Sequence, residues 1–236
     1  MFRKCVLAVT LILAFTAQVF AHDFFIEKKD GAYYVVSGHE NNWEAYDPTR
    51  IKEVKAFNEK GREVAAKVST LKGGVSIAAD ENIAAIIVFM DNGFWVNSTV
   101  GWKNITKREA KEQSLQLTEN GESYKYGKYI EIWSKKFRKP LGTKMEVVPL
   151  SNPLALKQGD TLKVQLLLDG KPLPNSPISL KGSPGEIGKT DKNGIARIPI
   201  GKAGQTFISA STQVPYKDNP DADQLYLKAT LAFEVK

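Results

Sequence analysis

Residue pairs that favour tight turns interrupt this sequence at short intervals and leave little room for long helices. The pairs Asp-Gly, Lys-Gly, Gly-Gly and Asn-Gly separate short runs that are rich in β-branched and aromatic residues. Such runs, bounded by turn chemistry, are typical of strands. The sequence therefore predicts strands over Tyr33 to Val36, Glu63 to Val68, Val75 to Ala79 and Ala84 to Phe89.

The stretch ESYKYGKYIEIWSKKF has a period of two residues. Tyr124, Tyr126 and Ile130 share one parity, whereas Lys125 and Glu131 take the other. Side chains of a strand alternate between its two faces, so this pattern predicts another strand. In the first half of the chain, only Thr106 to Gln113 (TKREAKEQ) indicates a helix, and that helix is short.

The second half of the chain predicts a β-domain of its own. Two prolines bracket a polar turn in VVPLSNPLALKQGD, which suggests a boundary in this part of the chain. Strands are expected over Thr161 to Leu168, Ile195 to Ile200, Phe207 to Thr212 and Tyr226 to Val235. We therefore expect an all-β fold with two β-sandwich-like domains, 22–143 and 144–236, the second one immunoglobulin-like or transthyretin-like.

The first twenty-one residues have the features of a secretory signal peptide. Arg3 and Lys4 precede an apolar run from Val6 to Phe15, and Val19-Phe20-Ala21 fits a small-residue cleavage site. The run is short for a membrane span, which disfavours the alternative of an uncleaved anchor. We expect residues 1–21 to be removed and the protein to be secreted into the periplasm.

Cleavage after Ala21 removes the only cysteine, Cys5, and so excludes disulfides and thiolate chemistry from the mature chain. The formal net charge of +7 falls by two when Arg3 and Lys4 are lost, which leaves a mildly basic protein. No nucleic-acid-binding motif is present. With two histidines and no cysteine, hydrolytic triads have no support, and we expect the protein not to be an enzyme.

Both histidines of the chain, His22 and His39, lie within one short segment. Cleavage after Ala21 would give His22 a free α-amine, which can chelate a metal ion together with the imidazole of the same residue. A turn at Asp30-Gly31 would fold the strand Phe24 to Glu27 back onto Tyr33 to Ser37. Such a hairpin would bring Gly38-His39-Glu40 close to the new N-terminus.

Acidic residues around the histidines can complete a metal shell. Glu40 directly follows His39, and Asp23, Glu44 and Asp47 are near in sequence. Nitrogen ligands with one carboxylate suit nickel, cobalt, copper or zinc rather than calcium or magnesium. The sequence therefore predicts a transition-metal site made by His22, His39 and Glu40. The simpler alternative is a solvent-exposed terminal histidine and a second histidine that occupies a turn.

The sequence also resembles a known family over nearly the whole mature chain. The segments that carry the resemblance are HDFFIE, SGHENNWEAYDPTRIKEVKAFNEKGREV, DNGFWVNSTVGWKNITKREAK, YKYGKYIEIW and KPLGTKMEVVPLSNPLALKQGDTLKVQLLLDGKPL. They are similar to periplasmic proteins associated with ABC-type cobalt and nickel uptake, a domain-of-unknown-function family. This resemblance implies a secreted, β-rich protein that binds nickel or cobalt through His22 and His39, with Glu40 beside the second, and that works with the membrane components of a transporter.

Two other functions stay open at this point. A copper carrier or copper enzyme with an N-terminal histidine brace would use His22 in a similar way, although such a brace usually takes its second histidine from a position far along the chain. A structural or adhesive β-sandwich module would need only the strand pattern and turns such as the one in DGKPL.

Overall fold

The computed structural model describes residues 23–39, 42–80, 82–183 and 185–236. Strands dominate these ranges, and the one α-helix among them is α1 (Lys107–Glu112). Short 3₁₀ turns lie at η1 (Pro48–Arg50), η2 (Lys135–Arg138) and η3 (Pro153–Ala155). Within the described ranges, none of the helices has the length and apolar character that a membrane crossing requires. The expected all-β class is confirmed.

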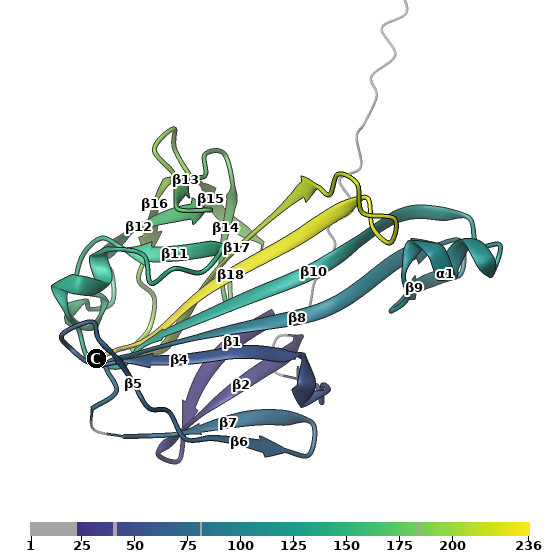
Figure 1. Cartoon of the computed structure of the whole chain (residues 1–236). Helices are drawn as coiled ribbons and strands as arrows, with labels where there is room; N and C mark the ends of the chain where they lie inside the picture. The colour runs from purple at the N-terminus through teal and green to yellow at the C-terminus, as the bar shows by residue number, and fades with distance from the viewer. Residues whose placement is uncertain (1–22, 40–41, 81, 184) are drawn as a thin grey trace, which may run out of the picture.

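Three sheets make up the fold (Figure 1). The first has the order β1-β2-β7-β6, with β3 paired to β2. Its strands are β1 (Asp23–Lys29), β2 (Ala32–His39), β3 (Asn42–Trp43), β6 (Val68–Leu71) and β7 (Gly74–Ala78). A third, smaller sheet has the order β11-β12-β13, with β16 paired to β12. Its strands are β11 (Met145–Pro149), β12 (Thr161–Leu168), β13 (Lys171–Pro172) and β16 (Ile195–Pro199).

The second sheet is the largest and has the order β15-β14-β17-β18-β10-β8-β4-β5, with β9 paired to β8. Its strands are β4 (Ile51–Phe57), β5 (Glu63–Val64), β8 (Ala85–Ser98), β9 (Gly101–Lys103), β10 (Leu117–Ile130), β14 (Pro177–Leu180), β15 (Glu186–Lys189), β17 (Gly204–Pro215) and β18 (Gln224–Val235). At its centre, β10 and β18 run parallel, whereas the other strand pairs that the structure describes are antiparallel. We call this second sheet the central sheet.

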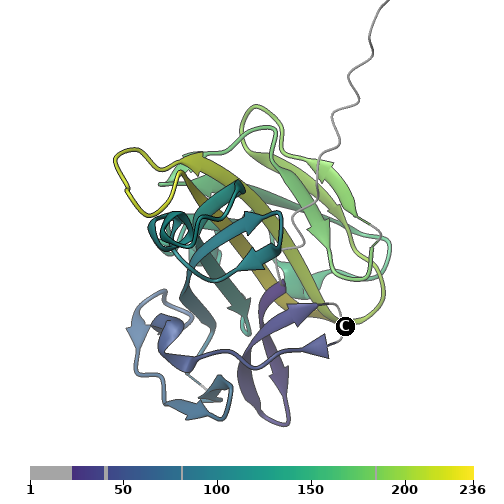
Figure 2. The same cartoon turned by 90° about the vertical axis from the view of Figure 1, so that its right-hand side faces the viewer.

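Each face of the central sheet is covered by one of the two smaller sheets. Along β8, Ala85 and Ile87 join the core that includes β11, β12 and β16, whereas the alternate residues Ile86 and Val88 join the core under β1, β2 and β7. Figure 2 shows the layers from the side. The protein therefore consists of two β-sandwich-like units that share their middle sheet. In the second unit, antiparallel strands face one another across an apolar core, as in immunoglobulin-like sandwiches.

Strands from both sides of the expected domain boundary pair within the central sheet. β10 precedes Thr143 and β18 follows Lys144, and their register runs without interruption from Gly121↔Gln224 to Ile130↔Phe233. Phe207 and Ala232, from the second half of the chain, also belong to the core under the first sheet. Whether 22–143 and 144–236 fold independently stays a prediction.

Local chemistry explains the first hairpin. Asp30 and Gly31 both have positive φ angles, of 49° and 74°, as a two-residue hairpin turn requires. They join β1 to β2 in the predicted antiparallel register. The hairpin packs across β10, where Gly127 leaves space for Phe24 and Ile26: a Cβ atom on Gly127 would lie 3.3 Å from the Phe24 ring.

One predicted strand is wrong in its extent. The run Glu63 to Val68 is divided between β5, which pairs with β4, and β6, which pairs with β7. The physical reason is that the chain leaves the central sheet after Val64 and joins the first sheet at Val68, so no single strand can cover the run. The short helix is confirmed: Thr106 caps α1 and forms a capping box with Glu109.

A buried ion pair connects the central sheet to the third sheet. Lys128 on β10 binds Glu146 on β11, and both side chains are almost fully buried. The Glu146 carboxylate also accepts hydrogen bonds from the backbone N–H groups of Leu141, Gly142 and Thr143. Burial lowers the pKa of Lys128, and the charge of Glu146 opposes that change. The pair thus fixes the loop that enters β11.

Breaking this pair should be strongly destabilising. Glu146→Gln keeps an acceptor for the loop but leaves the Lys128 ammonium buried without its counter-charge, so we expect the free energy of unfolding to fall by about 3–5 kcal/mol. Urea denaturation measures the loss. The control is Lys144→Met, which removes an exposed pair with Asp169 at 2.9 Å and should change stability by about 1 kcal/mol or less. Equal losses in the two variants would contradict this account.

Candidate functional site

The predicted metal ligands fall at the edge of what the structure describes. His22 and Glu40 lie outside the described residues, and for His39 only the backbone is described, as the last residue of β2. Among the described residues, no group of three or more histidine, cysteine, aspartate or glutamate side chains is arranged to hold a metal ion. The three-ligand site therefore stays a prediction.

The backbone register nevertheless brings together the two chain positions that the prediction needs. Asp23, the first residue of β1, is paired with Gly38, the next-to-last residue of β2. The chain then turns back, so that Gly38 also pairs with Trp43 of β3. The residue that follows His22 in sequence thus lies opposite the residue that precedes His39. We call this region the hairpin end.

The acidic residues proposed from sequence have different surroundings. Asp23 forms an ion pair with Lys228, with an Oδ1 to Nζ distance of 3.1 Å. Asp47 accepts a 2.9 Å hydrogen bond from the backbone N–H of Thr49 and caps η1, which lowers the pKa of its exposed carboxyl. Glu44 is exposed, and its backbone N–H donates to the carbonyl of Ser37 at 2.7 Å. Of these three acids, Glu44 and Asp23 belong to the hairpin end.

Two buried lysines under the hairpin end were not predicted as site residues. Lys125 on β10 and Lys228 on β18 are direct partners in the parallel register, so their side chains leave the same face of the central sheet. They are only 2% and 8% exposed. The alternation in the sequence places Lys125 on the face opposite Tyr124 and Tyr126, but it does not show what covers that face. The first sheet covers that side, so Lys125 lies inside the protein.

The pKa values of Lys125 and Lys228 are both lowered. Burial, followed by the neighbouring charge of Lys228, lowers the pKa of Lys125 to about 7, while Asp23 and Glu44 oppose the change. Burial also lowers the pKa of Lys228, against the opposing effect of Asp23. Both ammonium groups are therefore held in a low-dielectric region at some energetic cost, a combination that is often found at functional sites.

A third lysine joins the second half of the chain to the hairpin end. Lys181, which follows β14, places its Nζ 4.2 Å from the ring centroid of Trp43 and 4.9 Å from that of Phe207. The Trp43 indole N–H donates to Glu27 Oε2 at 3.1 Å. These contacts hold β3 and β1 against the central sheet. They leave the hairpin end supported from three directions, by β10, β18 and the segment after β14.

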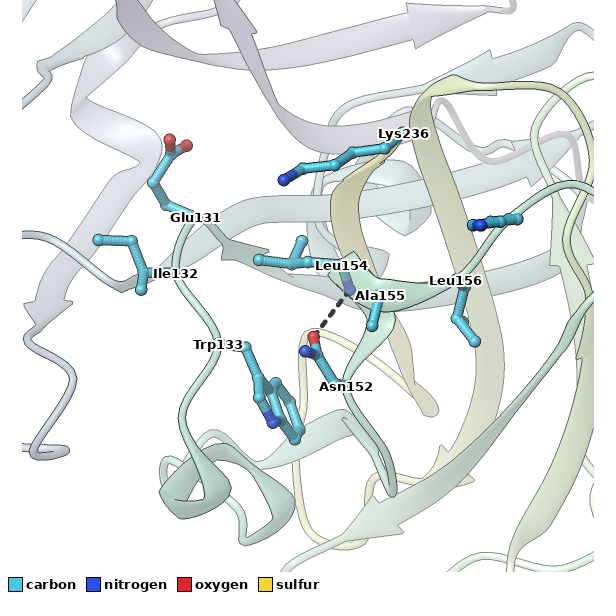
Figure 3. A pocket seen from close by; sticks show the side chains of 9 residues that line it. Glu131, Ile132, Trp133, Asn152, Leu154, Ala155, Leu156 and Lys236 are labelled. Atoms are coloured by element: carbon cyan, nitrogen blue, oxygen red, sulfur yellow. Dashed lines mark hydrogen bonds between the residues drawn. The ribbon is translucent and has the colours of Figure 1, made fainter.

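An open pocket of about 480 Å³ lies elsewhere in the molecule. Figure 3 shows that Trp133, Leu154 and Leu156 line it, together with Glu131 and Lys236. Lys28, near the turn of the first hairpin, binds Glu131 at 2.6 Å. The pocket is therefore next to the turn of the hairpin, at the opposite end from His39. Its lining offers one carboxylate side chain and no histidine, which is a poor donor set for a transition metal.

The pKa of Lys125 has a consequence for stability. Between about pH 7, the pKa of Lys125 in the folded protein, and its ordinary value of 10.5, the unfolded chain binds more protons than the folded one. Stability should therefore rise with pH in this window, by up to about 1.4 kcal/mol per pH unit. Below pH 7 the lysine is charged in both states, and the full burial penalty is present.

Lys125→Met should remove this dependence. We expect the variant to be more stable than the native protein at pH 6 and the difference to shrink as the pH rises towards 9, because the burial penalty on the charged lysine disappears. Urea denaturation at pH 6, 7, 8 and 9 measures the effect. Lys163→Met, on the exposed side of β12, is the matched control. Parallel pH profiles for native protein and Lys125→Met would refute the assignment. The groups that act on Lys125 are Lys228, Asp23, Arg50 and Glu44.

Comparisons with known proteins give a family but no activity. The chain is similar to an uncharacterized protein of Haemophilus influenzae, with 24% identity over 236 residues and 99% of each chain covered. Among solved structures, it is similar to the D0-D1 domain of Intimin, with 17% identity, a TM-score of 0.23, and coverage of 89% of this chain and 97% of that one. It is also similar to the four N-terminal immunoglobulin domains of Dscam1, with 11% identity, a TM-score of 0.21, and coverage of 88% and 41%. Both TM-scores are low.

A family model covers most of the sequence. It matches residues 19–214, which include the hairpin end, β10 and most of the second sandwich. The chain therefore belongs to the family described as Domain of unknown function (DUF4198).

Proposed function

We propose that this protein is a periplasmic metal-binding protein that assists nickel or cobalt uptake by an ABC-type transporter. Its metal ion is cargo, bound at the hairpin end after a signal peptide has been cleaved before His22. The ligands are the α-amine and imidazole of His22, the imidazole of His39 and the carboxylate of Glu40. The protein itself carries out no reaction.

One observation supports this proposal above the others. The register pairs Asp23, which follows His22, with Gly38, which precedes His39, although the two histidines are seventeen positions apart in sequence. A transition-metal site needs donors within about 2.0–2.3 Å of one ion, so its ligands must come from neighbouring backbone positions. The antiparallel hairpin supplies such neighbours.

The donor chemistry favours a borderline transition metal. An α-amine has a reference pKa of about 7.7–8.0, so a metal ion displaces its proton at modest cost near neutral pH. Two imidazoles and one carboxylate complete a set that suits nickel, cobalt, copper or zinc, and ligand type alone does not choose among them. Nickel or cobalt is preferred here because of the resemblance to uptake proteins, and copper is the first competitor to test.

Metal binding should depend on the free amine of His22. We expect protein that begins at His22 to bind nickel or cobalt at least tenfold more tightly than the same protein with an added N-terminal Gly-Ser, a difference of about 1.4 kcal/mol. The extension converts a two-point chelate into a single imidazole contact. Calorimetric titration with nickel, cobalt and copper measures the affinities.

Point variants separate the proposed ligands. His22→Ala, His39→Ala and Glu40→Gln should each weaken binding, whereas Glu59→Gln, an exposed acid in the turn before β5, should not. A native N-terminus without measurable metal binding would reject the proposal. Tight binding of copper alone would replace it with a copper carrier. Binding that survives His39→Ala unchanged would reduce the site to the terminal residue.

A further inference from the structure

We propose that one end of this protein is a peripheral docking surface for a membrane with anionic phospholipids. The surface combines the turn between β4 and β5 with η2, and we call it the basic end. Its six cationic side chains are those of Lys60, Arg62, Lys135, Lys136, Arg138 and Lys139. This inference goes beyond the proposed function, because it requires neither histidine and no metal ion.

The first step of the argument is how the chain presents η2. Phe137 is fully buried in the core between the central sheet and the third sheet, and it anchors the turn. Ser134 caps the turn, because its hydroxyl accepts a hydrogen bond from the backbone N–H of Lys136 at 3.3 Å. With Phe137 inside the protein, the basic residues around it are exposed, namely Lys135, Lys136, Arg138 and Lys139.

The second step is the approach of another basic segment. Asn58 Oδ1 accepts hydrogen bonds from the backbone N–H groups of Lys60 and Arg62, which closes the turn between β4 and β5. Gly61 in that turn lies against η2, since a Cβ atom on Gly61 would be 3.1 Å from the Cβ of Lys136. In Figure 1 both turns lie at the left, at the end of the central sheet opposite α1. Two segments that are distant in sequence thereby form one surface.

The third step is the charge balance of this surface. Two exposed acidic side chains, Glu59 and Glu63, lie in or next to the same turn and oppose the six basic ones. Within the described ranges, none of the six basic side chains forms an ion pair, whereas Lys107 and Lys144, for example, are paired with aspartates. Unpaired like charges repel one another and do not stabilise the fold. An anionic surface would supply the missing counter-charge.

The residue types favour a lipid surface over a partner that is recognised by its shape. Four of the six residues are lysines, whose ammonium groups are compact point charges on flexible stems and need no fixed acceptor geometry. None of the six side chains lines the pocket at Trp133. Mobile phosphate headgroups can meet such a surface at many points, and each lysine or arginine near an anionic bilayer contributes about fivefold to the affinity.

The test measures co-sedimentation of protein beginning at His22 with vesicles made of equal parts of phosphatidylglycerol and phosphatidylethanolamine. We expect binding at low ionic strength, no binding to vesicles of phosphatidylcholine alone, and release in about 1 M salt, where the Debye length is about 3 Å. The triple variant Lys135→Gln, Lys136→Gln and Lys139→Gln should bind about 100-fold more weakly, because each lysine contributes about fivefold.

A matched control has the same net charge as this variant but loses lysines from the second sandwich. Its substitutions are at exposed positions and comprise Lys163→Gln, Lys189→Gln and Lys192→Gln. The control should bind the vesicles like the native protein. The double variant Lys60→Gln with Arg62→Gln should bind about 25-fold more weakly, because both segments contribute to the surface. All these variants should keep the native stability in urea, since each changed side chain is exposed.

A second readout locates the contact on the molecule. The only cysteine of the chain is Cys5, so protein beginning at His22 can carry a single fluorophore at an introduced cysteine. A fluorophore at Pro140→Cys, directly after η2, should be quenched by vesicles that contain a quencher-labelled lipid. A fluorophore at Gln113→Cys, at the end of α1, should keep its emission.

The outcomes are distinct. Absence of vesicle binding at low ionic strength would overturn the inference, and equal losses in the two triple variants would show that net charge alone drives the binding. Stronger quenching at Gln113→Cys than at Pro140→Cys would assign the contact to another face and also overturn it. If polyglutamate binds the basic end while the vesicles do not, the partner is an acidic protein, and the membrane assignment is wrong. Protein that binds the vesicles but no metal ion would reject the proposed function alone.

Discussion

Burial of both faces of the central sheet is the constraint on which the rest of this structure depends. A sheet with one solvent-exposed face can carry charged side chains on that face without protein partners. By contrast, β10 and β18 are covered by other sheets on both faces. Their buried charged side chains must therefore be paired inside the protein. Lys128 meets Glu146 on one side, and Lys228 meets Asp23 on the other. Each contact ties a different outer sheet to the same middle layer.

The ion pair between Asp23 and Lys228 ties the hairpin end to the central sheet. Terminal segments are generally the least ordered parts of a protein, which makes a chain terminus a poor place for a precise site. Here the first described strand lies between β2 and the parallel pair at the centre of the molecule, and it begins at an ion pair with that centre. A metal site at the proposed mature N-terminus would therefore be supported by the most deeply packed strands of the fold.

Turn chemistry and alternation were sufficient to predict much of the fold. Asp30-Gly31 defined the first hairpin, Thr161 to Leu168 matched β12, and Thr106 with Glu109 marked the one short helix. Local patterns could not reveal which sheet a strand joins, so the run Glu63 to Val68 was not divided. They also could not reveal that both sides of β10 are covered, so the alternation alone did not show that Lys125 is buried. For the site, the register of β1 with β2 was predictable from the turn between them. Lys125 and Lys228, which lie beneath that hairpin, are both more than a hundred residues after Asp23 in sequence, so no local pattern could place them there.

The parallel pairing of β10 with β18 has a consequence for the order in which the chain acquires its structure. β18 comprises residues 224–235, yet it lies between β10 and β17 in the middle of the sheet order. Until that segment is available, β10 has one open edge, and neither sandwich has its complete middle layer. Contacts between residues so distant in sequence raise contact order and slow the rate-limiting step of folding. A polypeptide whose middle strand is synthesised last therefore remains without its complete core for longer after synthesis.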